Sequence, residues 1–257
     1  MQNEKNIVLF SPTASSNEFT AKDDNFIRTQ VANSSAKFKD IVTYFLNRNV
    51  NNVIGIYDPN NLAYSKDLLR TLEEAFILQN GKKFVKEIDV TDSFISIKNS
   101  IQSYKSDLIV IAASSIDSAK LIQYLKLNNI NTPILASGWS KSRDFIEEGG
   151  KAVEGVMFTN LYDDDSKDKD FINFKKAFEN KYGSQPSTFS IQAYETTKIV
   201  IQTLKKDNNP NNFKQNILDK KVFEGLQGQI EFDQYGDVNR KYHLVSVQSG
   251  KFKKIQE

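Results

Sequence analysis

Residues 6–16 read Asn-Ile-Val-Leu-Phe-Ser-Pro-Thr-Ala-Ser-Ser, and this stretch decides the fold that we expect. The four consecutive apolar residues 7–10 predict a strand that is buried on both faces, as in a parallel sheet covered by helices. Pro12 ends this strand, because proline has no N–H to donate to a neighbouring strand. We therefore expect an α/β protein that begins with a parallel strand.

The loop after this strand is rich in hydroxyl groups, which come from Ser11, Thr13, Ser15 and Ser16. In open α/β sheets, ligands bind at the carboxyl ends of the strands. Hydroxyls and free backbone N–H groups in that position suit a small anion such as a carboxylate. The simpler interpretation of these residues alone is a polar turn whose serines cap a helix.

The composition is that of a globular protein of one to two domains, with 257 residues, 39% hydrophobic residues and a net charge of +2. No basic block stands out, so the charge gives no reason to expect nucleic-acid binding. The chain has no cysteine, which excludes disulfides, zinc–thiolate sites and thiol catalysis. No apolar run approaches the ~18 residues of a membrane span. Residues 1–5 are polar and show no signal peptide.

Strand and helix patterns alternate from residue 33 to about residue 160, with short loops between them. This order predicts a doubly wound, mostly parallel sheet with helices on both faces. The expected strands before and within this part are 25–29, 52–57, 84–90, 107–113, 133–136 and 153–161, and the expected helices are 34–46, 64–80, 93–104, 116–128 and 142–148.

The rhythm changes after residue 160. Two successive helices are expected at 169–182 and 188–205, and a third at 212–218. The chain then ends in hairpin-like strands: 228–232, the turn 233–237, 242–247 and 252–255.

Five stretches, in this order and spacing, resemble the type I periplasmic solute-binding proteins of the branched-chain amino-acid (Leu/Ile/Val) group of ABC transporters. Each motif is weak alone, but together they extend over nearly the whole chain. The stretches are Ile7–Ser16, Val53–Leu68, Leu108–Ser115, Gly149–Thr159 (Gly-Gly-Lys-Ala-Val-Glu-Gly-Val-Met-Phe-Thr) and Phe223–Asp237 (Phe-Glu-Gly-Leu-Gln-Gly-Gln-Ile-Glu-Phe-Asp-Gln-Tyr-Gly-Asp).

The resemblance implies two α/β lobes joined by three crossovers, with the ligand held in an interlobe cleft. On that plan, residues 1–32 and 160–238 form the first lobe, and residues 33–159 and 239–257 form the second. The family has several βα units before the opening strand that this sequence lacks. At about 30 residues a unit, roughly a hundred residues would be missing. The first lobe is then expected to be incomplete, with an exposed edge that favours self-association.

In this family the opening loop binds the carboxylate and ammonium groups of an amino acid. Thr13 and Ser15 stand at the matching positions, directly after Ser11. Tyr64 matches an aromatic residue that reaches the ligand from the second lobe. The alternative for Tyr64 is an ordinary residue near the start of a helix.

Ser114 and Ser115 follow the strand 107–113 and are therefore further candidates for ligand binding, although they also suit the N-cap of the next helix. Trp139, the only tryptophan, stands where branched-chain amino-acid binders place an acidic residue against the ligand ammonium. It is able to stack on an aromatic ligand or attract an ammonium group by a cation–π contact. The alternative is ordinary packing.

Nothing in the sequence predicts catalysis. Residues 233–237 lack the ligand pattern of a calcium loop, and Gly149-Gly150 ends a helix instead of opening a phosphate-binding one. The single histidine, His243, lies in an expected strand without partners for a triad or a zinc site. We therefore expect no enzyme activity, no metal and no cofactor.

The function that the resemblance implies is capture of a small amino-acid-like solute outside the cytoplasm, in the periplasm or as a cell-surface lipoprotein. The ligand-bound protein would deliver this solute to an ABC permease. The alternative is a ligand-sensing ectodomain of a signalling receptor, because the same fold serves both roles.

Overall fold

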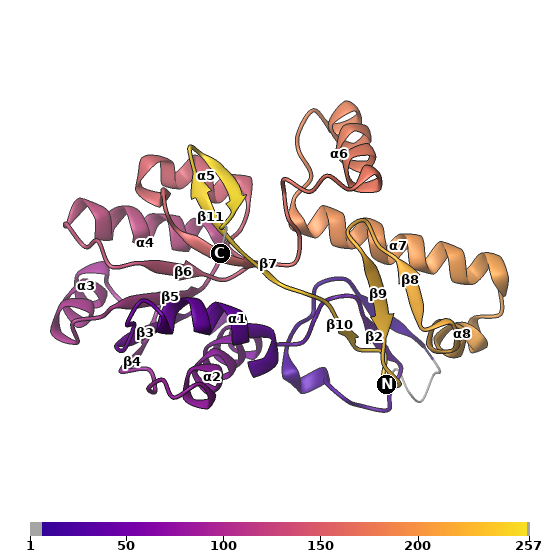
Figure 1. Cartoon of the computed structure of the whole chain (residues 1–257), viewed down its shortest axis with the longest axis horizontal. Coiled ribbons are helices and arrows are strands. Elements are labelled where there is room, and N and C mark those ends of the chain that lie inside the picture. Colours follow the sequence, from indigo (N-terminus) through magenta and orange to yellow (C-terminus); the bar gives the residue numbers. More distant parts are fainter. Residues whose placement is uncertain (1–6, 256–257) are drawn as a thin grey trace. The chain divides into compact units, whose positions relative to one another are not determined.

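The computed structural model describes residues 7–255. The chain forms two compact units (Figure 1), each of which is built from discontinuous segments. The first unit comprises Met1–Ala32 and Ser166–Lys241, and the second comprises Asn33–Asp165 and Tyr242–Glu257. The chain therefore passes between the units three times. The two later crossings lie a few residues beyond the expected boundaries at 159/160 and 238/239.

The second unit is built on a seven-stranded sheet with the order β12-β11-β7-β6-β5-β3-β4. Five strands are parallel, whereas β11 and β12 are antiparallel and close one edge. The doubly wound sheet predicted from residues 33–160 is therefore confirmed. The strands are β3 (Val53–Tyr57), β4 (Lys86–Asp89), β5 (Leu108–Ala112), β6 (Ile134–Ala136), β7 (Met157–Asn160), β11 (His243–Gln248) and β12 (Lys251–Lys254).

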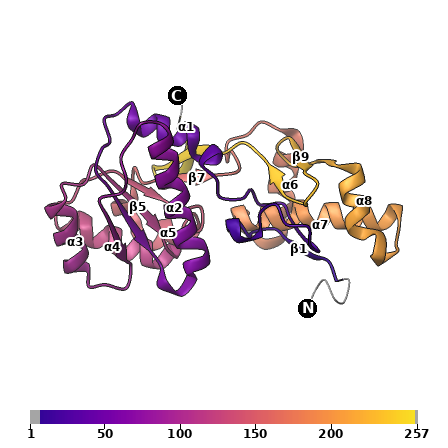
Figure 2. The same ribbon diagram turned by 90° about the horizontal axis from the view of Figure 1, so that it is seen from below.

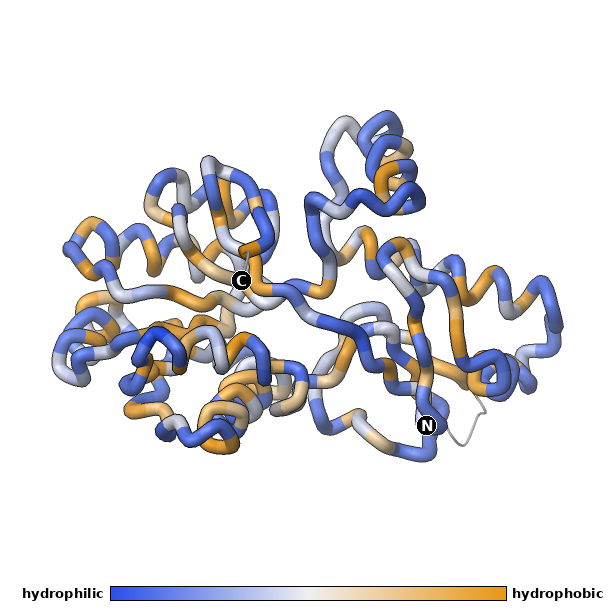
Figure 3. The backbone as a smooth tube through the Cα atoms, in the orientation of Figure 1, coloured by the Kyte–Doolittle hydropathy of each residue, from blue (hydrophilic) through white to orange (hydrophobic). Residues whose placement is uncertain are grey.

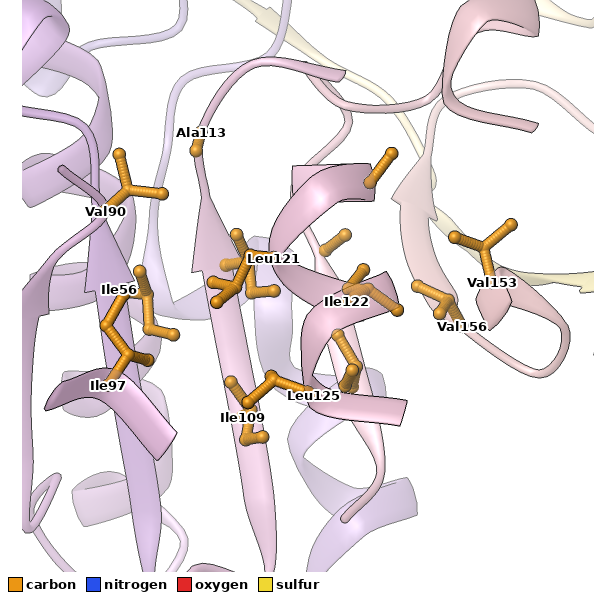
Figure 4. Close-up of a cluster of buried hydrophobic side chains, with 14 of the residues drawn as sticks. Ile56, Val90, Ile97, Ile109, Ala113, Leu121, Ile122, Leu125, Val153 and Val156 are labelled. Atoms are coloured by element: carbon orange, nitrogen blue, oxygen red, sulfur yellow. The ribbon is translucent and has the colours of Figure 1, made fainter. Parts of the chain in front are cut away.

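Helices cover both faces of this sheet, because successive strand residues point to opposite sides. In β5, Ile109 and Ile111 enter a core shared with α3, α4 and α5 (Figure 4), whereas Leu108 and Val110 enter a core shared with α1 and α2. The helices of the second unit are α1 (Ser35–Leu46), α2 (Leu62–Leu78), α3 (Phe94–Ser103), α4 (Ser115–Leu127) and α5 (Arg143–Gly149).

Four helices of this unit begin within one residue of their predicted starts and are capped by serine side chains: α1, α3, α4 and α5. Helix α2 begins two residues before its predicted start, and no side chain caps it. The Ser34 hydroxyl accepts a hydrogen bond from the Lys37 N–H at 3.1 Å, and Ser93 caps α3 in the same way. Hydrophobic and hydrophilic residues alternate along the helices (Figure 3), as expected for helices with one buried face. No helix among residues 7–255 is both long and apolar enough to cross a membrane.

The first unit contains two small sheets (Figures 1 and 2). One is the parallel pair β1 (Leu9–Ser11) and β2 (Phe26–Arg28), and the other is antiparallel with the order β10-β9-β8. The remaining elements of this unit are α6 (Lys169–Tyr182), α7 (Thr188–Lys206), α8 (Phe213–Lys220), β8 (Val222–Glu224), β9 (Gln229–Phe232) and β10 (Val238–Asn239).

Three details of the expected fold are wrong. The opening strand is not buried on both faces, because β1 pairs with β2 alone among the described strands and Ile7 and Leu9 are each 48% exposed. The strand expected at 153–161 starts only at Met157, since Gly150–Val153 forms a 3₁₀ turn. The strands after residue 228 form two separate hairpins, one in each unit, because β9 pairs with β10 and β11 pairs with β12.

Candidate functional site

The loop after β1 folds back on its own backbone. The Ser11 hydroxyl accepts hydrogen bonds from the N–H groups of Thr13 at 3.3 Å and Ala14 at 3.0 Å. The Ser16 hydroxyl caps the 3₁₀ turn Asn17–Phe19 by accepting from the Glu18 N–H at 3.2 Å. The polar-turn interpretation therefore describes Ser11 and Ser16. Thr13 is exposed and Ser15 is buried in the same loop.

A fully buried arginine at the end of β2 donates hydrogen bonds to this loop. Arg28 Nη1 donates to the Ser16 carbonyl at 2.8 Å, and Nη2 donates to the Thr20 hydroxyl at 2.8 Å. Nε donates to Asp237 Oδ1 at 2.6 Å. Because all of these bonds leave one planar guanidinium, they fix the loop against both β2 and the β9–β10 hairpin.

Asp237 completes the clamp from the hairpin turn. Its second oxygen, Oδ2, accepts from the Ala21 N–H at 2.8 Å. Gly236, which precedes it, has a φ of +93°, and an added Cβ there would lie 3.2 Å from the Phe26 carbonyl oxygen. A glycine is therefore needed where the turn passes over β2. The turn 233–237 that the sequence predicts is present, but its role as an anchor for the opening loop was not expected.

Helix α7 contacts the end of β2 through polar side chains. The hydroxyls of Thr196 and Thr29 are hydrogen-bonded at 2.6 Å, and the Thr29 N–H donates to the Ser11 carbonyl at 3.1 Å. One turn earlier on α7, Gln192 is 1% exposed, and neither Nε2 nor Oε1 has a hydrogen-bond partner. An unpaired buried amide is costly, and nothing in the described part of this unit explains why Gln192 is buried.

In the second unit, the carboxyl ends of β3, β5, β6 and β7 lie at one edge of the sheet. The strand order reverses between β3 and β5, since β4 lies on one side of β3 and β5 on the other. The helices that follow these two strands cover opposite faces of the sheet, because α2 follows β3 into one core and α4 follows β5 into the other. Such a switch point opens a crevice in which α/β proteins bind ligands.

Ser114 and Ser115 follow β5 at this switch point. The Ser114 hydroxyl donates to Asp117 Oδ2 at 2.6 Å and accepts from the Asp117 N–H at 3.2 Å, so it serves as the N-cap of α4. Ser115 is the first residue of that helix and is half-buried. The helix-cap alternative is therefore established for Ser114.

Tyr64 and Trp139 lie together at the same edge. Tyr64 is in the first turn of α2, after β3, and Trp139 is in the turn after β6. Their ring centroids are 5.7 Å apart and the rings are perpendicular, at 90°. This edge-to-face geometry is favourable for two aromatic rings, and both rings stay half-buried.

Two neutral hydroxyl groups accompany this aromatic pair. The Ser137 hydroxyl is 2% exposed and makes no hydrogen bond of good geometry. Burial raises the pKa of Tyr64 to about 12, and the neighbouring Ser137 side chain and Trp139 backbone oppose the shift only in part. The phenol therefore stays neutral at physiological pH.

The turn that carries Trp139 is anchored on both sides. The Ser137 N–H donates to the Ile111 carbonyl at 2.8 Å, and the Ser140 hydroxyl donates to the Ala113 carbonyl at 2.9 Å. The Ser140 and Ser118 hydroxyls are 3.0 Å apart and are also hydrogen-bonded. These bonds fix the backbone on either side of Trp139.

The structure thus groups the predicted residues within each unit. Ser11 ends β1, Thr13 and Ser15 lie in the loop that follows, and Tyr64 contacts Trp139. Three residues of these sites were not predicted from the sequence: Arg28, Ser137 and Gln192. Only Ser137 had a signal of its own, since it directly follows a predicted strand. Among residues 7–255, no group of three histidine, aspartate or glutamate side chains is placed to hold a metal ion.

Comparison with known proteins decides the family. Residues 2–251 match the periplasmic binding protein family. The chain belongs to this family. The type I periplasmic-binding-protein fold predicted from the sequence is thereby confirmed, and the family is one of solute-binding proteins. A search of curated proteins found no match.

Several solved structures have the same fold as this periplasmic binding protein. The leucine-binding protein LivK from Thermotoga maritima has a TM-score of 0.88 at 19% identity, over 99% of this chain and 74% of that one. An R. palustris ABC transporter solute-binding protein in complex with benzoate has a TM-score of 0.87 at 18% identity, over 99% and 71%. LivJ from Streptococcus pneumoniae, in complex with isoleucine, has a TM-score of 0.84 at 19% identity, over 99% and 74%.

Proposed function

We propose that this periplasmic binding protein captures a small carboxylate solute, an amino acid or a related compound, and delivers it to an ABC permease. The observation that carries the proposal is the hydroxyl-rich loop after β1. Its position at the carboxyl end of a parallel strand suits a ligand, and the Arg28–Asp237 clamp fixes its backbone in advance. The similar solved structures include a leucine-binding protein and complexes with isoleucine and with benzoate. Leucine, isoleucine and benzoate each carry a carboxylate group.

Each unit offers polar groups of a different kind. In the first unit, Thr13 and Ser15 supply hydroxyls for the carboxylate, because Ser11 and Ser16 are engaged with the backbone. In the second unit, Tyr64, Trp139, Ser115 and Ser137 offer aromatic and hydroxyl groups to a solute at the carboxyl edge of the sheet. Ser114 contributes through the cap that fixes the start of α4. These groups bind and orient a molecule, and the proposal assigns them no catalytic step.

The location that fits this function is outside the cytoplasm, either free in the periplasm or anchored to the cell surface as a lipoprotein. The alternative role, a ligand-sensing ectodomain, is not better supported by the comparisons.

The test is titration of the purified chain with amino acids and short carboxylates, followed by Trp139 fluorescence and by thermal unfolding. A bound ligand stabilises the folded state by mass action, so a solute should raise the melting temperature and change the fluorescence with the same midpoint. The Trp139→Phe variant is the control for the optical signal and should keep the thermal shift. If every amino acid and carboxylate leaves both signals unchanged at millimolar concentration, the proposal is wrong.

We also propose that the chain self-associates through the free edge of β1. Among the described strands only β2 pairs with β1, and Leu9 on this strand is half-exposed. Open strand edges of this kind template pairing with a second chain. Light scattering after gel filtration should show a mass that rises with concentration, and Leu9→Lys should suppress the rise. A monomer at every concentration would refute the idea.

A further inference from the structure

We infer that the solute is a small aromatic carboxylate whose ring is recognised by Tyr64 and Trp139. The inference rests on the proposed function and narrows its ligand, because it concerns the second unit alone. It starts from the rigidity of Trp139. The hydrogen bonds of Ser137 and Ser140 to the β5 segment hold the turn around the indole, and Gly138 lies against β7, where an added Cβ would be 3.1 Å from the Thr159 carbonyl oxygen.

The two rings form a prepared aromatic surface. They meet edge to face at a centroid distance of 5.7 Å, and each keeps part of its surface exposed. Aromatic rings prefer offset or perpendicular partners at centroid distances of about 4.5–7 Å, so a third ring can join this pair at little cost in side-chain entropy.

The polar groups beside the rings favour a ligand without an ammonium group on this side. The Ser137 hydroxyl is buried beside the Tyr64 phenol, and that phenol is neutral. Two acidic side chains that follow β3 and β5 at this edge of the sheet are engaged elsewhere. Asp58 accepts from the Asn60 N–H at 2.8 Å, and Asp117 accepts from the Ser114 hydroxyl at 2.6 Å. Neutral hydroxyls and ring edges suit a phenyl ring that carries a hydroxyl or other small polar substituent.

The experiment is calorimetric titration of the whole chain with benzoate, 4-hydroxybenzoate, leucine and isoleucine. We expect at least one aromatic carboxylate to bind ten-fold or more tightly than either aliphatic amino acid. Trp139→Leu should weaken aromatic binding by about ten-fold, and Trp139→Phe should recover most of the loss. The matched control is Tyr194→Leu, which removes a half-exposed tyrosine in the first unit whose ring centroid lies 4.6 Å from that of Phe174. This variant should bind the aromatic compounds as tightly as the parent chain does.

Each outcome separates the ligand class from the proposed function. If leucine or isoleucine binds more tightly than both aromatic compounds, or if Trp139→Leu binds aromatic compounds as well as the parent chain does, the aromatic inference is wrong while the proposed function stands. If none of the four compounds binds, the inference that the solute is an aromatic carboxylate is wrong for benzoate and 4-hydroxybenzoate. The broader solute panel then decides the proposed function independently.

Discussion

Arg28 and Asp237, which are 209 residues apart in the sequence, form a buried ion pair with Nε and Oδ1 at 2.6 Å. Arg28 has no exposed surface, and its other nitrogens hold the carbonyl of Ser16 and the hydroxyl of Thr20. The pair therefore links the β9–β10 hairpin to the loop that carries Thr13 and Ser15. A charge buried so completely is tolerated because each guanidinium nitrogen has a hydrogen-bond acceptor and one acceptor is a carboxylate.

Breaking this pair should be strongly destabilising. Asp237→Asn keeps the shape of the side chain but leaves the Arg28 charge uncompensated, so we expect a loss of about 3 kcal/mol in the free energy of unfolding, measured by urea denaturation. Glu147→Gln is the matched control, because it removes the carboxylate of an exposed pair with Arg143 at 2.5 Å. That control should cost less than about 0.5 kcal/mol. Equal effects of the two variants would contradict a structural role for the buried pair.

The hydroxyls of Thr13 and Ser15 should matter for ligand binding and little for stability. Thr13→Ala and Ser15→Ala each remove one donor to a carboxylate, and a hydrogen bond to a charged group is worth about 1.5–3 kcal/mol. We expect ten-fold or greater weakening in calorimetry with the best solute of the panel. Ser96→Ala, an exposed serine on α3, should leave affinity unchanged. Wild-type affinity in both loop variants would exclude this loop as the carboxylate site.

Tyr64 should make stability depend on pH in the alkaline range. Its pKa is raised by burial from 10.0 to about 12 in the folded state. The folded chain therefore keeps a proton that the unfolded chain loses, and stability falls as pH rises from 10 towards 12, by at most ~3 kcal/mol. Below pH 10 both states are protonated and the effect is absent. Tyr64→Phe should remove this component from urea-denaturation curves, whereas Tyr104→Phe, an exposed tyrosine of the same unit, should retain it.

The buried Gln192 amide should lower the free energy of unfolding. Its buried amide has no partner at either atom, so Gln192→Leu should raise the free energy of unfolding by about 1–2 kcal/mol. Gln202→Leu lies on the same helix but removes an acceptor of Lys220 at 3.3 Å, so it should bring no gain. If Gln192→Leu stabilises the chain and also weakens solute binding, the amide contacts the solute. A destabilised Gln192→Leu would show that the amide is satisfied in solution.

The second unit shows how much of the fold local sequence could predict. Apolar runs such as Leu108–Ala112 are long enough to mark strands buried on both sides, and serines such as Ser34 and Ser93 mark the start of helices. The first unit was harder. The apolar residues of β1 look like those of a central strand, yet β1 has one partner among the described strands and Leu9 is 48% exposed. Hydrophobicity alone does not reveal how many strands lie beside a given one.

The candidate site divides in the same way. The sequence by itself determined the approximate ends of the strands. It therefore placed these residues at or just beyond strand ends: Ser11, Thr13, Ser15, Ser114, Ser115 and Trp139. Only the tertiary structure decided that Arg28 meets Asp237 and that Tyr64 meets Trp139. It also decided that Ser137 is buried and that the buried Gln192 amide has no hydrogen-bond partner. The physical reason is the distance along the chain over which each interaction acts. Strands and helix caps are set by neighbouring residues, whereas side-chain pairing and burial depend on segments that are far apart in the sequence and meet only on folding.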